Sequence, residues 1–238
     1  MFNIKANNKK LLIVIPVYNE EDVIEKVLYD WINLKLSLEF KILVIDDGSK
    51  DSSIKLINKV RKNSDKIIEF NRVNSGHGNT ILFGYKYALE NNYDLIFQTD
   101  SDNQFNPKDL IKLLGLLNSH SELILGERKK RKDVFIRVLL SKIFLRGAVF
   151  VLFGKFIKDP NIPYRLITKK FLTKFIKSLK KDSYLAPNIL MAIYAKKIDT
   201  IEVNHYERKT GNLAWSSIKL FKFCFNLFFE IIIYRFKL

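Results

Sequence analysis

The sequence has few of the residues that cross-link or interrupt a chain. Its one cysteine, Cys224, excludes an internal disulfide, and three scattered histidines argue against a zinc site. Nine glycines and five prolines occur in 238 residues, with no repeat and no low-complexity linker. No uncharged apolar run reaches the roughly 18 to 20 residues that cross a bilayer. With 47% hydrophobic residues, the chain is expected to fold around one large core.

Acidic residues are also scarce. The 25 acids stand against 41 lysines and arginines, and the net charge of +16 predicts an anionic partner: a nucleic acid, a phosphate-bearing substrate or a membrane surface. Ten basic residues and one acid lie between Arg128 and Lys158, interleaved with aliphatic and aromatic residues. Residues 213–238 repeat this pattern. The interleaving favours amphipathic helices that lie on a membrane surface.

Alternatives remain open for these two basic, apolar regions. Their helices could pack into the core or form a contact between copies of the chain, and a separate membrane protein could provide the anchor. No nucleic acid partner is expected, because the basic run contains no recognisable binding module. The amino end does not resemble a signal peptide, since Lys9-Lys10 precede only a short apolar run before Tyr18. We therefore expect peripheral association with the cytoplasmic face of a membrane.

Strand and helix patterns alternate over the first 126 residues. Apolar, β-branched runs predict strands at residues 11–15, 41–45, 67–70, 94–98 and 122–125. Apolar residues at helical spacing predict helices at 23–32, 78–91 and 107–117, and another that begins near Asp51 or Ser52. This alternation is typical of an α/β domain with a mostly parallel sheet flanked by helices.

Polar clusters follow three of the predicted strands. Asp100-Ser101-Asp102 comes directly after the fourth strand, Asp46-Asp47 follows the second, and residues 16–20 follow the first. Ligands of such sheets bind at the carboxyl ends of the strands, so these clusters are expected to face one crevice. Carboxylate and amide oxygens suit Mg²⁺ or Mn²⁺, and the candidate metal ligands are Asp100, Asp102 and Gln104. Each acid pair, taken alone, could also be an ordinary turn or helix cap.

Together these motifs resemble a known family. The chain is similar to family 2 glycosyltransferases of the GT-A (Rossmann-like) fold in the runs Ile13-Val14-Ile15-Pro16-Val17-Tyr18-Asn19-Glu20, Val44-Ile45-Asp46-Asp47-Gly48-Ser49 and Thr99-Asp100-Ser101-Asp102. Within that family it most resembles the dolichyl-phosphate mannosyltransferase and polyprenyl-phosphate glycosyltransferase branch, through Gly126-Glu127-Arg128, Asp159-Pro160, Tyr164-Arg165-Leu166 and Arg208-Lys209-Thr210-Gly211. The resemblance covers roughly residues 11–220.

The resemblance implies a nucleotide-sugar donor. The residues implied to bind it are Pro16, Val17, Tyr18, Glu20, Ile45, Asp47, Asp100, Ser101, Asp102, Arg128 and Arg208. Asp102 and Arg128 are the implied catalytic residues, and Arg165 is a candidate contact to the acceptor or its phosphate. A metal ion and guanidinium groups would stabilise the charge that develops on the departing nucleoside diphosphate. Arg128 could instead only attract anions, and Arg165 could be a structural salt-bridge partner.

The chain departs from this branch at two places. Residues 183–190 lack the acid that related enzymes often carry there, and Ala214 stands where the branch often has a lysine. The second departure weakens any claim about acceptor-phosphate contacts near Gly211. A transferase acting on a sugar hydroxyl needs a general base, usually a carboxylate, whereas a phosphate acceptor is already anionic. The missing acid therefore favours a lipid phosphate that attacks the anomeric carbon in line, with inversion. Asp182 as a base, or Asp102 orienting the acceptor, keeps hydroxyl acceptors open.

Three functions follow from these observations. The first is a metal-dependent, inverting glycosyltransferase that moves a sugar from a nucleotide sugar to a polyprenyl (dolichyl-type) phosphate at the membrane surface. The second is a family 2 enzyme that extends a lipid-linked or surface glycan at a hydroxyl. The third is an inactive membrane-surface binding module. We expect a glycosyltransferase domain at 1–212, with an amphipathic insertion at about 134–158, and an amphipathic helical segment at 213–238.

Overall fold

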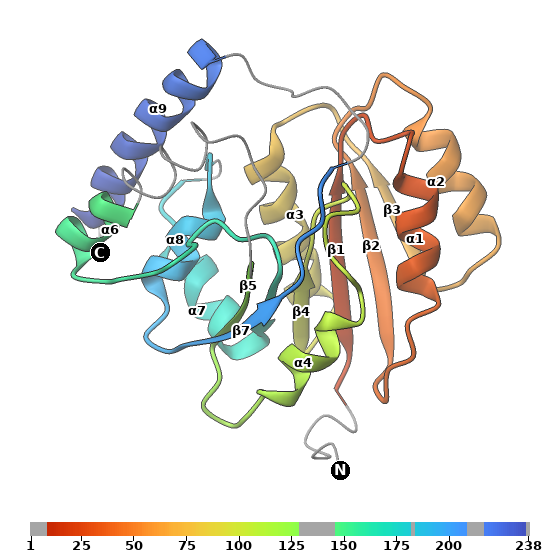
Figure 1. The fold of residues 1–238 in the computed structure, drawn as a ribbon, viewed down its shortest axis with the longest axis horizontal. Coiled ribbons are helices and arrows are strands. Elements are labelled where there is room, and N and C mark those ends of the chain that lie inside the picture. Colours follow the sequence, from red (N-terminus) through yellow and green to blue (C-terminus); the bar gives the residue numbers. More distant parts are fainter. Residues whose placement is uncertain (1–8, 129–145, 182–183, 209–216, 237–238) are drawn as a thin grey trace.

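The computed structural model describes residues 9–128, 146–181, 184–208 and 217–236. Within them, the strands form one seven-stranded sheet in the order β3-β2-β1-β4-β6-β5-β7 (Figure 1). The strands are β1 (Leu11–Val17), β2 (Phe40–Asp46), β3 (Ile67–Asn71), β4 (Leu95–Gln98), β5 (Leu123–Arg128), β6 (Arg165–Thr168) and β7 (Ile198–Val203). β1 to β4 are parallel and β5 is parallel to β7, while β6 runs antiparallel to β4 and β5. The predicted mostly parallel sheet is confirmed.

Helices cover both faces of this sheet, which is why its central strands are apolar on both sides. The helices are α1 (Ile24–Ile32), α2 (Ser53–Lys62), α3 (His77–Glu90), α4 (Asp109–Gly115), α6 (Arg146–Phe153), α7 (Lys169–Ser178), α8 (Pro187–Tyr194) and α9 (Ser217–Arg235). Neighbouring β4 residues point to opposite faces: Phe97 contacts Trp31 of α1 at 5.5 Å between ring centroids, and Gln98 accepts a hydrogen bond from Tyr85 of α3. α1 and α3 therefore lie on opposite faces.

β1 is longer than predicted, because Pro16 and Val17 belong to the strand and not to the loop. The backbone of Val14 faces β4, where its carbonyl accepts the Thr99 N–H at 3.1 Å. Pro16, two residues on, faces the same side, and β1 pairs with β4 only as far as Val14. The N–H that proline lacks would therefore have no strand partner. Pairing with β2 continues to Val17 and Asp46, so both following loops start at one level.

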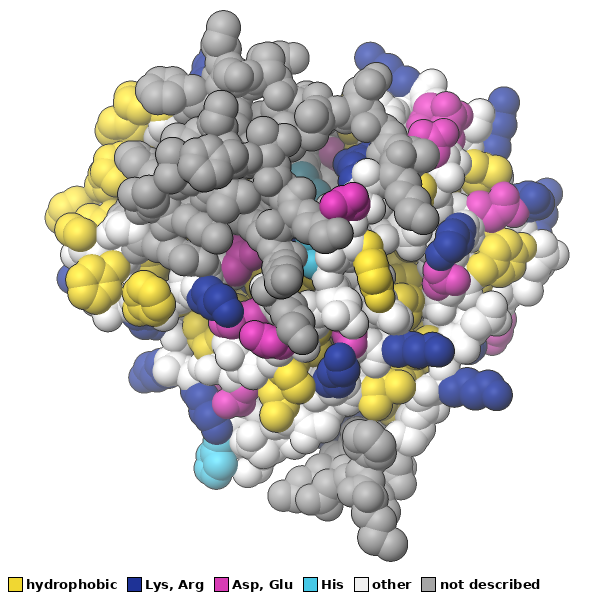
Figure 2. Space-filling view, in the orientation of Figure 1, with side chains coloured by type: hydrophobic (Ala, Val, Ile, Leu, Met, Phe, Trp, Pro, Cys, Tyr) yellow, Lys and Arg dark blue, Asp and Glu magenta, His cyan; other side chains and the backbone are white. Residues whose placement is uncertain are grey.

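The C-terminal helix α9 is amphipathic in its setting as well as in its sequence. Leu227, Ile231 and Tyr234 are buried, whereas Phe225, Phe229 and Ile233 are 54%, 46% and 39% exposed. α6 packs beside α9 and exposes Phe150 and Val151. Figure 2 shows hydrophobic side chains gathered on the side of the molecule where Figure 1 places these helices. One side of α9 thus packs into the core, as the alternative interpretation required, while the other side is exposed.

The exposed residues Phe150, Val151, Phe225, Phe229 and Ile233 form what we call the apolar face. The remainder of the basic, apolar region, residues 129–145, lies outside the described residues, as do Asp182 and Ala214. None of the helices in the described part of the chain has both the length and the apolar character needed to cross a membrane.

Candidate active site

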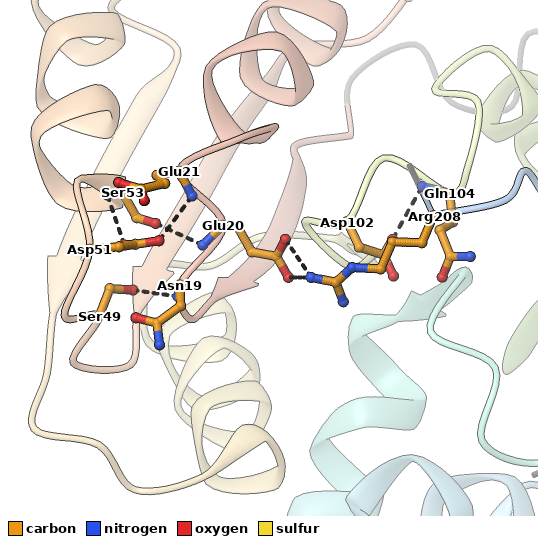
Figure 3. Close-up of polar contacts among 9 residues, drawn as sticks. All are labelled: Asn19, Glu20, Glu21, Ser49, Asp51, Ser53, Asp102, Gln104 and Arg208. Carbon is orange, nitrogen blue, oxygen red and sulfur yellow. Dashed lines mark hydrogen bonds and ion pairs between the residues drawn. The ribbon is translucent and has the colours of Figure 1, made fainter. Parts of the chain in front are cut away.

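The loops that follow β1 and β2 are tied together by side chains. Asn19 has a positive φ of 53°. Its backbone N–H donates to Ser49 Oγ at 2.9 Å, and its side-chain Oδ1 accepts the Lys50 N–H at 2.8 Å. The Glu20 N–H donates to Ser53 Oγ at 2.8 Å (Figure 3). The loops therefore hold each other, and the Glu20 side chain extends from them toward Asp102 and Arg208.

Asp46 and Asp47 hold turns in place at the end of β2. The Asp46 Oδ2 atom accepts the N–H groups of Gly48 and Ser49 at 3.2 and 3.0 Å. The Asp47 Oδ1 atom accepts from the Ser75 N–H at 2.9 Å, and Oδ2 accepts from the Gly76 N–H at 2.9 Å. The resemblance implies that Asp47 binds the nucleotide-sugar donor. Its carboxylate holds the loop before α3 at the end of β2, so a donor bound at Asp47 would also contact that loop.

Asp100 and Asp102 lie at the carboxyl end of β4, in a tight turn where Asn103 has a positive φ of 58°. The Asp102 Oδ1 atom accepts the Gln104 N–H at 3.2 Å. The buried Oδ1 atom of Asp100 has no hydrogen-bond partner among the described residues, and the Nε2 atom of His77 lies 3.7 Å from it. Burial, and then the charge of Asp100, raises the pKa of Asp102 from 3.8 to about 7.

These two carboxylates fit a divalent cation. The buried Oδ1 atom of Asp100 accepts no hydrogen bond among the described residues, and burial together with Asp100 disfavours the ionised form of Asp102. A hard divalent cation would stabilise both carboxylates in their ionised form. The oxygen-only donor set suits Mg²⁺ or Mn²⁺. The Gln104 side chain instead donates from Nε2 to the Tyr206 carbonyl at 3.0 Å, which favours a role in holding the turn over one as a metal ligand.

Arg208, which lies far from the other site residues in the sequence, forms an ion pair with Glu20 at this site. Its Nη2 atom lies 2.8 and 2.9 Å from the two carboxylate oxygens of Glu20 (Figure 3). The segment that carries Arg208 is fixed by backbone contacts, because Tyr206 N–H donates to the Gln104 carbonyl at 2.9 Å. Burial raises the pKa of Glu20, Arg208 opposes this, and the charge of Asp100 adds to it. Glu20, Asp100, Asp102 and Arg208 therefore share one electrostatic environment. The prediction that polar clusters after different strands lie close together is confirmed for Glu20 with Asp100 and Asp102.

The two other arginines have different surroundings. Arg128, at the end of β5, donates from Nε and Nη2 to Asp159 Oδ2 at 3.0 and 2.9 Å, and its side chain is 12% exposed. Arg165 is fully buried, and its guanidinium donates to the carbonyls of Ile162, Asn188 and Pro160. Burial lowers the pKa of Arg165. These contacts favour the structural role for Arg165 over contact with an acceptor, although its partners are backbone carbonyls and not the carboxylate expected of a salt bridge.

The remaining implied donor residues divide by exposure. Pro16, Val17, Ile45 and Ser101 are buried, whereas Tyr18 is 45% exposed. A cavity of about 800 Å³ adjoins Asp102 between α1 and α4.

Sequence reasoning did not assign roles to the loop residues Ser75, Gly76 and His77. The turn Ser75-Gly76-His77-Gly78 at the start of a helix was visible, and its glycines were the available signal for a loop close to a site.

Fold and site together define an α/β protein with a mostly parallel sheet and a candidate divalent-metal site at the carboxyl edge of that sheet. Comparison with known proteins specifies the family. The sequence profile described as "Glycosyl transferase family 2" matches residues 12–182. The chain belongs to glycosyl transferase family 2.

Curated relatives and known structures agree with this assignment. The chain is 26% identical over 223 residues to undecaprenyl-phosphate 4-deoxy-4-formamido-L-arabinose transferase of Proteus mirabilis, covering 92% of this chain and 66% of that protein. The protein of the same name from Salmonella choleraesuis is 27% identical with the same coverage. The chain therefore spans just under two thirds of the length of these relatives.

The fold is similar to glucosyl-3-phosphoglycerate synthase of Mycobacterium tuberculosis. Its complex with uridine diphosphate has a TM-score of 0.69 at 16% identity, covering 95% of this chain and 80% of that chain. The complex of that protein with Mn²⁺, uridine diphosphate and glucosyl-3-phosphoglycerate has a TM-score of 0.66 at 16% identity, with the same coverage. At this identity the similarity shows the fold, which is the GT-A fold.

Proposed function

We propose that this protein is a metal-dependent, inverting glycosyltransferase that transfers a sugar from a nucleotide sugar to a polyprenyl phosphate. The observation that carries the proposal is the meeting of Asp100 and Asp102 with the Glu20–Arg208 pair at the carboxyl edge of a family 2 domain. The names of the curated relatives support the acceptor class.

The donor would be bound through its diphosphate. Asp100 and Asp102 would hold Mg²⁺ or Mn²⁺, which when bound supplies positive charge to the diphosphate oxygens. Arg208 would provide a second positive charge beside the diphosphate, and its guanidinium is oriented by the Glu20 carboxylate. Arg128 is oriented in the same way by Asp159 at the end of β5. Fixed charges of this kind stabilise a leaving nucleoside diphosphate without reorganising during the reaction. A cavity of about 800 Å³ adjoins this site at Asp102, which lines it together with residues of α1 and α4.

The acceptor would be a nucleophile that is already charged. A phosphate oxygen forms the bond to the anomeric carbon while the bond from that carbon to the diphosphate oxygen of the donor breaks, so the configuration inverts. The electron pair of the broken bond leaves on the nucleoside diphosphate. A phosphate monoester is ionised near neutral pH, so no carboxylate has to remove a proton.

A lipid acceptor requires the protein to reach a membrane surface. The apolar face of α6 and α9 carries exposed phenylalanines, and Lys222 and Arg235 of α9 are exposed as well. Together with the net charge of +16, this suits an interface that contains anionic lipids. We place the protein at the cytoplasmic face, where nucleotide sugars would be available to it, and retain a homo-oligomer or a separate anchor protein as possible partners.

Transfer of radioactivity tests the proposal directly. A panel of radiolabelled nucleotide sugars is incubated with the protein, Mn²⁺ and undecaprenyl phosphate in detergent, and the organic phase is counted. The expected product is soluble in organic solvent and releases the sugar in mild acid. Asp102→Asn should abolish it, and Asp65→Asn, at a side chain 90% exposed, serves as the matched control. A parallel incubation with a lipid-linked glycan that becomes labelled, while undecaprenyl phosphate does not, would support a hydroxyl acceptor instead. The absence of any product with any donor would contradict the enzymatic function.

A further inference from the structure

The C-terminal helix α9 contributes a carboxylate to a segment that has none of its own. Glu230 is partly buried, and its Oε2 and Oε1 atoms accept the N–H groups of Leu185 and Ala186 at 3.0 and 3.3 Å. These amides precede α8, so the charge also lies near a helix N-terminus, where a carboxylate is stabilising. Glu230 therefore fixes residues 184–186 to α9.

The same segment is pressed against the first turn of α3. The Tyr184 N–H donates to Asn79 Oδ1 at 3.0 Å. At Gly78 the approach is so close that an added Cβ would lie 2.2 Å from the Tyr184 carbonyl oxygen and 2.5 Å from that of Leu185. A glycine is required there because the neighbouring atoms are backbone. Displacement of residues 184–186 would therefore disturb the start of α3.

The start of α3 in turn shapes the candidate active site. Asn79 Nδ2 donates to the Ser75 carbonyl at 2.8 Å, so the residue that binds the 184–186 segment also holds the loop. The N–H groups of Ser75 and Gly76 donate to Asp47, and His77 faces Asp100 at 3.7 Å. An unbroken series of contacts thus runs from α9 to two carboxylates at the carboxyl edge of the sheet.

We infer that Glu230 is a positioning residue: it holds residues 184–186 against α3 and thereby fixes the loop Ser75–His77 around Asp47 and Asp100. The position of α9, the helix that bears the apolar face, then determines how firmly the loop Ser75–His77 is held. The inference that Glu230 fixes the loop depends only on the contacts above. The further consequence, that Glu230 affects nucleotide affinity, rests on the proposed function.

Hydrogen exchange of the full-length protein tests the effect on the loop without any ligand. Loss of one hydrogen bond of about 1 kcal/mol corresponds to about fivefold faster exchange. Glu230→Ala is expected to accelerate exchange of the Ser75 and Gly76 amides by about that factor. The matched control is Tyr234→Phe, which removes the 3.2 Å contact between Tyr234 and Ser178 Oγ on the same helix but not the contacts to residues 184–186. It should leave both amides within about twofold of wild type.

Two further variants separate positioning from loss of folding. Glu230→Gln keeps one acceptor oxygen and should accelerate exchange of the Ser75 and Gly76 amides less than Glu230→Ala does. If Glu230→Ala does not fold, Glu230→Gln still tests the inference. Gly78→Ala displaces the same segment from the other side, so its effect on exchange and that of Glu230→Ala should be less than additive. Unchanged Ser75 and Gly76 exchange in both Glu230 variants, or equal acceleration in Tyr234→Phe, would overturn the inference.

Binding of uridine diphosphate in the presence of Mn²⁺ tests the consequence for the donor. Glu230→Ala is expected to weaken this binding about threefold to fivefold, and Tyr234→Phe to leave it unchanged. Equal affinity of wild type and Glu230→Ala, with faster loop exchange in the variant, would refute the link to the donor. Failure of the wild-type protein to bind any nucleotide would count against the proposed function, while the exchange experiment would still decide the role of Glu230.

Discussion

Removing the charge of Asp102 should make the metal-free protein more stable while abolishing its activity. The pKa of this carboxyl is raised from 3.8 to about 7, chiefly by burial and then by Asp100. A raised pKa means that the folded state binds the proton more tightly than the unfolded state. The ionised carboxylate therefore destabilises the fold at neutral and higher pH, and the penalty disappears as the pH falls from about 7 toward 3.8.

The size of this effect follows from the two pKa values. At about 1.4 kcal/mol per pH unit the full difference corresponds to roughly 4 kcal/mol above pH 7. Asp102 is partly exposed, so solvent screens the effect, and we expect about half of it, or ~2 kcal/mol. For a chain of this size that corresponds to an increase in melting temperature of roughly 4 to 8 °C.

Thermal unfolding in the presence of a chelator measures the prediction. Asp102→Asn should melt above wild type at pH 8, and the difference should shrink toward pH 4. Asp65 is an exposed carboxylate just before β3, and the stability of Asp65→Asn should differ from that of wild type by less than about 0.5 kcal/mol at both pH 8 and pH 4. Excess Mn²⁺ should stabilise wild type and not Asp102→Asn, because only wild type retains both carboxylates. Lower stability of Asp102→Asn at pH 8 would refute the reasoning about this carboxylate pair.

Three other substitutions have clear expected outcomes. Gly84→Ala would place a Cβ 2.4 Å from Val14 Cγ1 and should cost about 1 to 3 kcal/mol in urea unfolding; an unchanged midpoint would show that the α3 contact with β1 can relax. Arg165→Leu leaves three buried carbonyls without their hydrogen-bond donor and should lower the free energy of unfolding by about 3 kcal/mol or more. An unchanged stability with an altered KM for the acceptor would instead show that Arg165 contacts the acceptor. Arg208→Ala should weaken Mn²⁺-dependent binding of uridine diphosphate by about tenfold in calorimetry, less so at high salt, and equal affinity would remove Arg208 from the donor site.

The parts of the fold that could be predicted were those with local signals. Apolar runs such as residues 42–45 are buried on both faces, and their composition alone indicates strands in a covered parallel sheet. The proximity of the acids that follow β1 and β4 was also predictable, because the carboxyl ends of parallel strands meet at one edge. The first strand was predicted too short, because a proline usually ends a strand and the place of Pro16 within β1 depends on where its pairing with β4 stops.

The partners of the site residues could not be predicted from the sequence. Asp47 binds amides of a loop 28 and 29 positions away, and Arg208 binds Glu20 across 188 positions. An arginine in a motif can serve a ligand or the backbone, and only the burial of Arg165 distinguishes the two. Glu230 was visible as the acid in an apolar, basic helix, but its role depends on how that helix packs against residues 184–186.

The central claim is that Asp100 and Asp102 bind a nucleoside diphosphate through a divalent cation. Calorimetric titration of nucleoside diphosphates into the wild-type protein, with Mn²⁺ and with a chelator, tests it most directly. We predict binding of one nucleotide in the presence of Mn²⁺, loss of that binding with the chelator, and the same loss in Asp100→Asn and Asp102→Asn. Equal affinity with and without Mn²⁺, or undiminished binding by both variants, would contradict the claim.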